Sequence, residues 1–533
     1  MNKSLQLVTS VALMFIARSH AQAPVLGTSS NFALFSTNGE VSNVGLSQLT
    51  GNVGTNNGPN TNFGNVDGVM HTADGATAQA AADLTVAYNQ LFAAIPNFFP
   101  APLLGNGQTL FAGTYAIGES ASLNNTLTLD GQGNVNAVFI FKVQGAFSSA
   151  AGAQVLLTNG ALACNVFWKI EGLVDLATNT VMKGTIVANN SAIVLRSGVS
   201  LEGRALSTTG AVTVSGVTAR IPLGCGSPVL TGPASPPMNT VLCYTIFSGN
   251  GEVTNTGVSL VTGDVGTNVG LTSGFQQANV TGTIHENPDS STAQCASDLN
   301  TVYSYLNTLP VDIELLYPAA FGNNLVLTPH TYLLNAATVV NGTISLNAQN
   351  NPDAVFVIKI VGALSTSTYA QVILLNEAQA KNVFWKIDGA TSLNDYTNFK
   401  GTVIGNNGAM ILNTGVAIEG RALSTSGGIT TFAINAQATP GCAGLGTTTT
   451  TAPKQLAQLY PNPFNEVLNV SLIAFTSAQA KLNIYNTLGM LVLSSSLNSA
   501  ETTIAVNLPS GIYYYKISDS DGSEQAGKLI SKQ

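Results

Sequence analysis

Residues 184–207 read GTIVANNSAIVLRSGVSLEGRALS, and this stretch contains one step of a short repeat. The segment GTIVA at 184–188 is followed 19 residues later by GRALS at 203–207. Between them lie short β-branched or aliphatic runs that are broken by Gly, Ser or Asn. Short strands with turns at this spacing are typical of a β-solenoid, in which a coil of about 19 residues holds three strands and three corners. Stacked coils bury an apolar interior and pair their backbones, so they need few charged side chains.

The surrounding sequence occurs twice in the chain. Four motifs return in the same order: TGNVGTN (50–56) as TGDVGTN (262–268), AVFIFKV (137–143) as AVFVIKI (354–360), NVFWKI (165–170) unchanged at 382–387, and EGRALST (202–208) unchanged at 419–425. We therefore expect two copies of one solenoid domain, at 24–225 and 240–442. A Pro-rich and fairly stiff linker at 226–239 joins them. A Thr-rich tether at 443–454 leads to a third, smaller unit at 455–533.

One amphipathic helix interrupts the strands of each copy. In the first copy we expect it within residues 72–95, where apolar side chains recur at helical spacing, and Pro96 ends it. In the second copy the segment TAQCASDLNTVYSYL at 292–306 precedes Pro310. An apolar stripe on a helix usually faces the protein core, so we expect both helices to pack on a solenoid face. The stripe of the first helix consists of Ala80, Leu84, Tyr88 and Leu91.

The composition excludes several classes of function. Charged residues make up 8% of the chain, against roughly 25% in an average soluble domain. Lys and Arg number 18 and Asp and Glu 26, so the net charge is -8, which disfavours binding to nucleic acid or to an anionic membrane. Hydrophobic residues reach 45%, which disfavours disorder. The sequence therefore predicts a folded, mainly β protein with an uncharged surface.

The first 23 residues have the pattern of a secretory signal peptide. Lys3 precedes an apolar run from Leu5 to Ala17, and Ala21-Gln22-Ala23 provides a small-residue cleavage site. The run is too short for a stable membrane anchor, and no later segment has 18 or so uninterrupted apolar residues. We expect a protein that is secreted or displayed on the cell surface, without membrane insertion.

The repeated motifs resemble the ice-binding (antifreeze) proteins of polar bacteria, yeasts, diatoms and fungi. The resemblance rests on TGNVGTN, HTADGATAQAAADL, AVFIFKV, NGALACNVFWKIEG and GTIVANN…EGRALSTTGAV, and it extends over nearly all of both copies. It implies two discontinuous right-handed β-solenoids, triangular in section, each with one long helix alongside. It also implies a monomer that adsorbs to ice through one flat face, inhibits ice growth and recrystallisation, and uses no cofactor and no metal.

In that family the contact residues lie at outward positions of one strand column, often in a Thr-Ala/Gly-X-Thr/Asn pattern. The sequence matches this pattern only in part, at Thr50, Thr209 and Thr262. Uncharged small side chains are preferred because a charge would lose its hydration on docking. Alternatively, these residues are ordinary strand and corner positions. The candidates are Thr50, Asn52, Thr55, Thr185, Val187, Asn189, Ser207 and Thr209 in the first copy, and Thr262, Thr267, Thr402, Ile404, Asn406, Ser424 and Ser426 in the second.

The five cysteines form no CxxC pair, so a zinc or iron–sulfur site is not expected. Export permits disulfides. We favour a Cys243–Cys442 bond that closes the second copy over a Cys225–Cys243 bond across the linker. Cys164 and Cys295 are expected as buried free thiols.

The C-terminal unit carries YPNPF (460–464), YNTLG (485–489) and LPSGIYYYK (508–516), with alternating apolar residues that predict a small β-sandwich. These motifs resemble the C-terminal sorting domain of the type IX secretion system in Bacteroidetes. The resemblance implies recognition by the secretion machinery, followed by removal or exchange for a surface anchor.

Catalysis is not expected. His71 and His285 occupy equivalent positions just before the helices, where a capping role is more typical than chemistry. Glu202 with Arg204, and Glu419 with Arg421, are expected as corner ion pairs. The alternative function is a cell-surface adhesin or carbohydrate-binding module. Such modules use exposed aromatic side chains, whereas Trp168 and Trp385 lie in apolar strands and are expected in the core.

Overall fold

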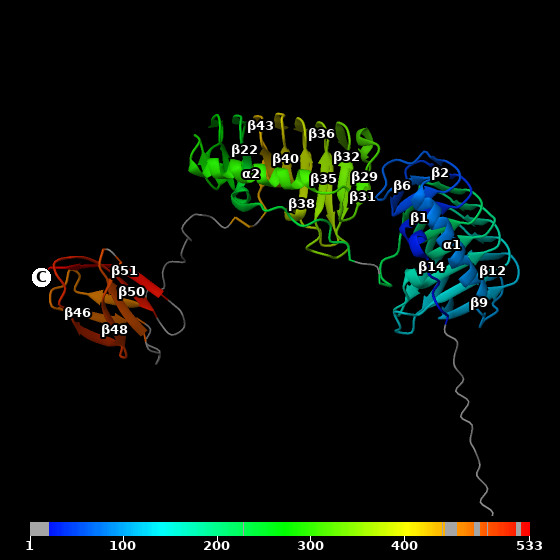
Figure 1. Ribbon diagram of the computed structural model, residues 1–533, viewed down its shortest axis with the longest axis horizontal. Helices are drawn as coiled ribbons and strands as arrows, with labels where there is room; N and C mark the ends of the chain where they lie inside the picture. Colours follow the sequence, from blue (N-terminus) through cyan, green and yellow to red (C-terminus); the bar gives the residue numbers. More distant parts are fainter. Residues whose placement is uncertain are drawn as a thin grey trace, which may run out of the picture. The chain divides into compact units, whose positions relative to one another are not determined.

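The computed structural model describes residues 21–226, 229–439, 441–442, 456–473, 480–487, 489–518 and 524–532. Nearly all of the expected signal peptide, and the expected tether at 443–454, lie outside these ranges. The chain divides into two compact units, Met1–Cys442 and Ala443–Gln533. The first unit contains two stacks of parallel strands, each with one long helix, and the second contains antiparallel strands (Figure 1).

Each coil of the first solenoid contributes strands to three faces, which we call a, b and c. The chain turns between faces at residues with left-handed φ, such as Asn179 (60°) and Gly198 (75°). Two long strands, β17 (Val181–Ala188) and β19 (Ser200–Ser207), continue from the c face onto the a face. The other a-face strands are β1 (Phe32–Ser36), β4 (Asn52–Thr55), β6 (Met70–Thr72), β9 (Gly113–Ile117), β12 (Phe139–Val143) and β15 (Val166–Ile170). The c-face strands are β3 (Gln48–Thr50), β8 (Gln108–Phe111), β11 (Thr126–Asp130), β14 (Gln154–Thr158) and β21 (Thr218–Arg220). The b-face strands are β2 (Val41–Val44), β5 (Asn60–Thr61), β7 (Leu103–Gly105), β10 (Ala121–Asn124), β13 (Phe147–Ser149), β16 (Val174–Leu176), β18 (Ile193–Leu195) and β20 (Val212–Ser215).

The second solenoid repeats this plan. Its long strands are β40 (Asn398–Gly405) and β42 (Ala417–Ser424). The a face adds β22 (Tyr244–Ser248), β25 (Asp264–Thr267), β28 (Ile284–His285), β29 (Ile313–Glu314), β32 (Thr331–Leu334), β35 (Phe356–Ile360) and β38 (Val383–Ile387). The c face adds β24 (Leu260–Thr262), β27 (Val280–Thr281), β31 (Leu325–Leu327), β34 (Thr343–Asn347), β37 (Gln371–Leu375) and β44 (Asn435–Gln437). The b face holds β23 (Val253–Thr256), β26 (Thr272–Ser273), β30 (Phe321–Gly322), β33 (Thr338–Asn341), β36 (Leu364–Thr366), β39 (Thr391–Leu393), β41 (Met410–Leu412) and β43 (Ile429–Phe432).

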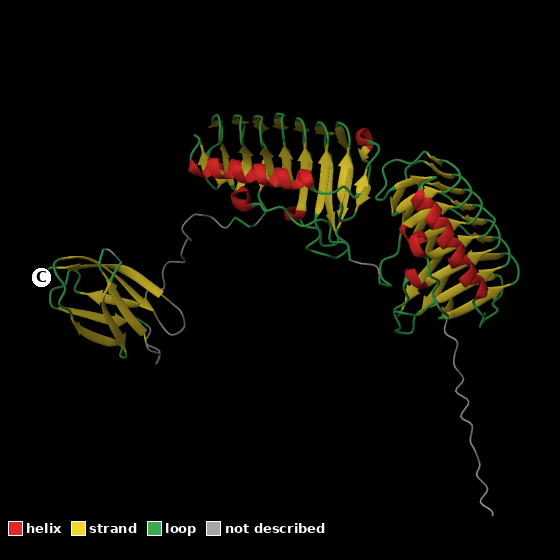
Figure 2. Cartoon of the chain, in the orientation of Figure 1, coloured by secondary structure: helices red, strands yellow, loops and turns green. Residues whose placement is uncertain are grey.

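The solenoids are discontinuous, as expected. β1 pairs with β19 on one side and with β4 on the other, so the first coil lies beside the last one. The chain then passes through a cap, residues 56–72, and along helix α1 (Gly75–Ala93) before it reaches β9 at the other end. The helix has 19 residues, and a helix of that length extends about 28 Å, close to six strand spacings of about 4.8 Å. Figure 2 shows each helix running across the strands of one face.

The helices pack on the a faces through the expected apolar stripe. Leu84 and Leu91 of α1 are buried against Phe35, Ile140 and Phe167 of the strands below. Helix α2 (Ser290–Thr308) packs in the same way on the second solenoid. The interiors hold Trp168 and Trp385, both fully buried, and each indole Nε1 donates to a backbone carbonyl oxygen at 2.9 Å. The prediction that both tryptophans are core residues is confirmed.

Polar side chains hold both ends of each helix. Asp74 caps α1 by accepting from the Thr77 amide, and His71 Nδ1 lies 2.7 Å from the Asp74 carboxylate. His285 and Asp289 repeat this arrangement in α2. The capping role expected for both histidines is confirmed. At the other end, Lys142 donates to two carbonyl oxygens at the end of α1, which stabilises the negative end of the helix dipole.

A carboxylate network joins the a face to the helix. Glu171 accepts hydrogen bonds from Lys169, from Tyr88 Oη of α1 and from Asn189 Nδ2. Burial raises the pKa of Glu171, but these three hydrogen bonds outweigh it and hold the pKa below the usual range. A depressed pKa means that the folded state binds its proton less readily than the unfolded state does.

We expect acid to weaken this network. The stabilisation by Glu171 is complete above the pKa of an unfolded glutamate, about 4.3, and is lost as the pH falls through the lower folded value. Thermal unfolding at pH 7 and pH 3 should therefore show a smaller acid-induced loss of Tm in Glu171→Gln than in the wild type. The control is Glu119→Gln, which changes an exposed carboxylate outside the network. Equal losses in Glu171→Gln and the wild type would contradict this prediction.

Two disulfides close the solenoids. Cys243–Cys442 is present, which confirms that prediction. Cys225 bonds to Cys164, so the alternative Cys225–Cys243 bond is wrong, and so is the free thiol expected at Cys164. Cys164 lies in a short 3₁₀ turn (η2, Ala163–Asn165) that faces the last residues of the first copy, which the linear sequence did not reveal. Cys295 is a buried free thiol, as expected.

We expect loss of the Cys243–Cys442 bond to lower stability more than loss of Cys164–Cys225. The two bonds span 199 and 61 residues, and a longer closed loop restricts the unfolded chain more, with typical effects of about 2–4 kcal/mol. Thermal unfolding of the paired Cys→Ser variants (Cys243 with Cys442, and Cys164 with Cys225) measures this difference. A larger loss of Tm for the shorter loop would overturn the ranking.

The cap of the first solenoid contacts the end of the second one. Asp67 is 3% exposed, and its carboxylate accepts from Tyr332 Oη at 2.5 Å and from Thr328 Oγ1 at 2.8 Å. Asn65 exchanges two hydrogen bonds of 2.9 Å with the backbone of Tyr317. We call these contacts, together with Val69, which packs against the core of the second solenoid, the clasp.

The C-terminal unit is a small β-sandwich, as expected. In the described residues, one antiparallel sheet contains β45 (Ala457–Tyr460), β46 (Val467–Leu472) and β49 (Glu501–Ala505). The other contains β47 (Ala480–Tyr485), β48 (Leu491–Leu497), β50 (Gly511–Ser518) and β51 (Glu524–Ser531). The two sheets share one apolar core that includes Phe464, Leu482 and Ile517. None of the helices in the described ranges has the length and apolarity needed to cross a membrane.

Candidate functional site

Eight of the fifteen candidate residues are buried, so their side chains cannot meet a flat external surface. They have relative exposures of 0–1%: Thr55, Thr185, Val187, Ser207, Thr267, Thr402, Ile404 and Ser424. Four lie at the a–b corner, where Thr55, Ser207 and Thr267 donate to carbonyl oxygens of Gly39, Ser191 and Gly251 in the adjacent turns. The hydroxyls of these three residues therefore satisfy turn backbone inside the solenoid, whereas the fourth, Ser424, has a buried hydroxyl with no hydrogen-bond partner among the described residues.

The other buried candidates lie on the a face, beneath the helices. Val187 and Ile404 belong to the apolar clusters that α1 and α2 cover. Thr185 accepts a hydrogen bond of 3.2 Å from the buried Arg204. Thr402 is its counterpart in the second solenoid. The prediction that this strand column forms the outer contact face is wrong, because the column is buried beneath the helices.

The remaining candidates are at least partly exposed but do not form one column. Thr50 and Thr262 lie on the c face next to the caps, and Asn52 accepts the Val69 amide within the cap. Asn189 and Asn406 donate to Tyr88 and Tyr303 of the helices. Thr209 and Ser426 lie at the corner that leads into the b face, where they bond to Asn190 and Asn407.

The expected corner ion pairs are also wrong. Glu202 pairs with Lys183 and Arg220 on the c face, and Glu419 pairs with Lys400. Arg204 and Arg421 point to the other side of the same strands, where they are buried and donate to backbone carbonyl oxygens. Neighbours two apart in an extended strand share a face, but the chain bends between the c and a faces at Gly203 and Gly420.

Of the three faces of the second solenoid, the b face has its charged side chains at the cap end of its outward columns. The a face is covered by α2, and the c face carries the Lys400–Glu419 pair. On the b face each of these coils presents a small residue, an inward residue that is apolar or Thr, and a second small or aliphatic residue, as in Ala363-Leu364-Ser365 and Ala390-Thr391-Ser392. This arrangement gives two outward columns. Direct pairing aligns the first as Ser273, Thr254, Thr430, Ile411, Ser392, Ser365 and Val339.

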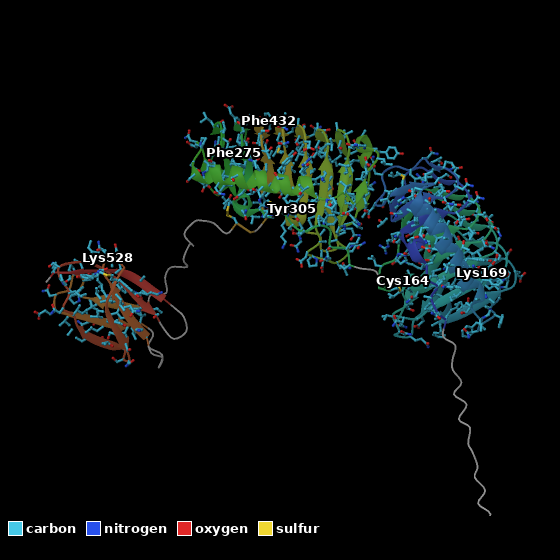
Figure 3. The ribbon with its side chains drawn as sticks, viewed as in Figure 1. Cys164, Lys169, Phe275, Tyr305, Phe432 and Lys528 are labelled. Atoms are coloured by element: carbon cyan, nitrogen blue, oxygen red, sulfur yellow. A yellow bond between two sulfur atoms is a disulfide. The ribbon has the colours of Figure 1, made fainter. Side chains whose placement is uncertain are left out.

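The side chains of the second outward column are even smaller. Backbone hydrogen bonds align Gly428, Ala409, Ala390, Ala363 and Ala337, with Glu252 at the cap end. Beyond Glu252 this column continues to Leu271 and Glu286 in the cap. The parallel strands carry the residues from Ala337 to Gly428 in register over several coils, so this part of the two columns is regular and contains no ionisable side chain. Phe432, labelled in Figure 3, ends strand β43 of this face.

The b face of the first solenoid has the same columns but is interrupted by charge. Asp175 occupies the position of Ser392, and Arg196 donates to its carboxylate at 2.7 and 2.8 Å. The hydrogen bonds from Arg196 lower the pKa of Asp175, so the carboxylate stays ionised at neutral pH. Leu173, which is 42% exposed, stands where the second solenoid has Ala390. The remaining first-column residues are Thr61, Ser42, Thr213, Val194, Ser148, Ser122 and the exposed Leu103.

The sequence pattern that marks this face, and that sequence reasoning did not use, is a tripeptide of two small or aliphatic outward residues around an inward apolar residue or Thr. It recurs once per coil and contains no Thr-Gly-X-Thr pattern. Among the described residues, no group of three or more His, Cys, Asp or Glu side chains could hold a metal ion.

Comparison with known proteins assigns both solenoids to one family. The family model described as ice-binding-like matches residues 35–219 and 247–436. The chain belongs to the ice-binding family. A second family model, described as a secretion system C-terminal sorting domain, matches residues 458–532 of the β-sandwich.

Individual members of the ice-binding family are similar over one copy or both. An ice-binding protein of Nostoc sp. (strain HG1) is 39% identical over 198 residues, which cover 36% of this chain and 72% of the relative. An ice-binding protein of Colwellia sp. is 31% identical over 219 residues, which cover 37% of this chain and 83% of the relative. The crystal structure of an ice-binding protein from an Antarctic Flavobacteriaceae bacterium is 74% identical, with a TM-score of 0.78. The match covers 79% of this chain and all of that one.

Proposed function

We propose that the exported protein adsorbs to ice through the b faces of its solenoids, and chiefly through that of the second solenoid. The observation that carries this proposal is the pair of outward columns of small uncharged side chains on that face. Adsorption of this kind pins the crystal surface, so the protein inhibits ice growth, produces thermal hysteresis and blocks recrystallisation. No catalytic step is needed.

The chemistry of the face suits a neutral lattice. Ice offers a flat, repeating and uncharged surface, and an ionised side chain would lose hydration on contact with it. Hydroxyl and methyl groups on a stacked sheet stay in fixed register, and stacking supports a flatter sheet than usual. A rigid face also limits the entropy that docking costs, so many weak contacts can add up.

The two copies should contribute unequally. Asp175 and Arg196 place a hydrated ion pair within the b face of the first solenoid, where the second solenoid has Ser392 and Asn413. We propose that the protein acts as a monomer whose two b faces raise the total contact area. The C-terminal domain directs its export by the type IX machinery, in line with the sorting-domain match.

The test is to give the first solenoid the residues of the second. In the full chain, Asp175→Ser with Arg196→Asn should raise thermal hysteresis at equal protein concentration, because it removes a hydrated ion pair from within the two outward columns. The matched control, Glu202→Gln with Arg220→Asn, removes a pair on the c face and should leave hysteresis unchanged. Freely growing, unshaped crystals in the presence of the wild type would refute ice binding. A rise in thermal hysteresis in the control variant alone would refute the assignment of ice binding to the b face.

A further inference from the structure

The corner between the b and c faces of the second solenoid carries two stacked tyrosines. Tyr369 and Tyr396 lie on adjacent coils, with ring centroids 5.0 Å apart and planes 10° apart. Both side chains are exposed, by 65% and 51%. Several other aromatic side chains are exposed, such as Phe99 and Tyr514, whereas Tyr369 and Tyr396 are exposed and also stacked on each other in adjacent coils.

The backbone at these positions is unfavourable for tyrosine. Tyr369 has φ of 61° and Tyr396 has φ of 58°, both in the left-handed region that Gly and Asn tolerate best. The same corner of the first solenoid holds Gly152 and Asn179, with φ of 70° and 60°. The second solenoid therefore keeps two tyrosines where smaller residues would adopt the same backbone with less strain.

Stability does not account for the pair. Stacking of two exposed rings offsets part of the strain, but Gly and Asn would avoid the strain altogether. Residues retained in strained conformations point to a function. We propose that Tyr369 and Tyr396 form a binding site for the pyranose rings of a neutral polysaccharide, separate from the proposed ice-binding face.

The surroundings leave room for a ring at one end of the stack. The ring of Tyr396 lies against Gly415, where an added Cβ would be 2.4 Å from Tyr396 Cδ1. On the other side of Tyr369 the corresponding corner residue is Gly342, where an added Cβ would meet nothing within 4 Å. This open ledge beside Tyr369 can receive a flat ring that stacks on the aromatic face.

The chemistry of the corner favours a sugar. The C–H face of a pyranose stacks on tyrosine, and its hydroxyl groups find hydrogen-bonding partners in exposed Thr368 and half-buried Ser367 and Asn341. The charged residue of these turns is Asp395, which is exposed and would repel the phosphates of a nucleotide or nucleic acid. A neutral polysaccharide therefore fits better than an anionic ligand.

The experiment restores the residues of the first solenoid. The full-length protein is run in native gels that contain cellulose derivative, laminarin, dextran, mannan or galactan, and retardation gives the affinity. We expect at least one polymer to retard the wild type, and Tyr369→Gly with Tyr396→Asn to weaken that retardation by about fivefold or more, the loss of a ring-stacking contact. Both replacements suit left-handed φ, so the double variant should fold.

Two controls separate this site from other effects. Tyr514→Asn removes an exposed tyrosine of the C-terminal domain and should not change retardation. Thermal hysteresis of the double variant should equal that of the wild type, because the pair lies outside the b-face columns. The proposal is overturned if no polymer retards the wild type, if the double variant is retarded equally, or if poly-L-proline binds at this corner in place of the sugars.

Discussion

Thr430→Tyr is expected to remove most of the thermal hysteresis of the full-length protein. Thr430 lies in the first outward column of the second b face, with Thr254 and Ile411 as its direct neighbours on either side. A tyrosine at this central position would stand above the small side chains around it and prevent a flat lattice from reaching them. Central contacts of an interface carry most of its binding energy, so the concentration needed for a given hysteresis should rise by about tenfold or more.

The chain offers two matched comparisons for this variant. Thr213→Tyr alters the equivalent position of the first solenoid, where Ser42 and Val194 are the neighbours. It should lower thermal hysteresis less than Thr430→Tyr does, because Asp175 already interrupts that face. Asn435→Tyr adds the same bulk to an exposed c-face position and should leave hysteresis unchanged. Nanolitre osmometry of the three variants, with circular dichroism to confirm folding, measures the effect. The assignment of the ice-binding site to the b face fails if Asn435→Tyr lowers thermal hysteresis as much as Thr430→Tyr does.

The sequence predicted the fold in detail because its periodicity is strong. The 19-residue step, the repeated motifs and the apolar stripe from Ala80 to Leu91 each correspond to an element of the structure. These features depend on spacing alone, and spacing is visible in one dimension. The Cys243–Cys442 bond was also accessible, since both residues lie at the ends of one copy.

The position of the proposed ice-binding face could not be predicted from the sequence in the same way. Each coil has three strands with similar alternation, and only the packing of α1 and α2 shows which face is covered. Thr185 and Thr213 look alike in sequence, yet one is buried beneath a helix and the other is on an open face. Polar residues such as Ser207 resembled surface positions because their partners are backbone carbonyl groups, which carry no sequence signal.

The junction between the solenoids was not predicted either. Asp67 corresponds to Thr281 in the second cap, since each pairs with the equivalent c-face threonine, Thr50 or Thr262. Thr281 is exposed, whereas Asp67 is buried between Thr328 and Tyr332. The partners of Asp67 lie in the other solenoid, far away in the sequence. The local sequence around Asp67 therefore does not mark it as an interface residue.

Asp67→Ala is therefore expected to uncouple the two solenoids. The substitution removes the carboxylate that accepts from the buried hydroxyl groups of Tyr332 and Thr328. Each hydroxyl keeps a second partner, the Thr328 carbonyl oxygen and His330 Nδ1, so the cost is that of lost buried hydrogen bonds, about 0.5–1.5 kcal/mol each. Because the clasp is the direct contact of the first cap with the second solenoid, the domains should unfold in two calorimetric transitions instead of a more cooperative one. The linker, which contacts the second solenoid through the carbonyl oxygen of Thr231, should become more sensitive to protease.

The matched control for the clasp is Thr281→Ala, which makes the same truncation at the free cap. It should change neither the calorimetric profile nor the rate of linker cleavage, because the Thr281 side chain is exposed. The two b faces can act on one crystal if the clasp holds the solenoids in a fixed orientation. In that case Asp67→Ala should also lower thermal hysteresis while each solenoid remains folded, because a flexible connection lowers the effective concentration of the second b face at the ice surface. A profile for Asp67→Ala that matches Thr281→Ala would show that the buried carboxylate does not couple the domains. Unchanged hysteresis with two separate transitions would instead show that the solenoids bind ice independently.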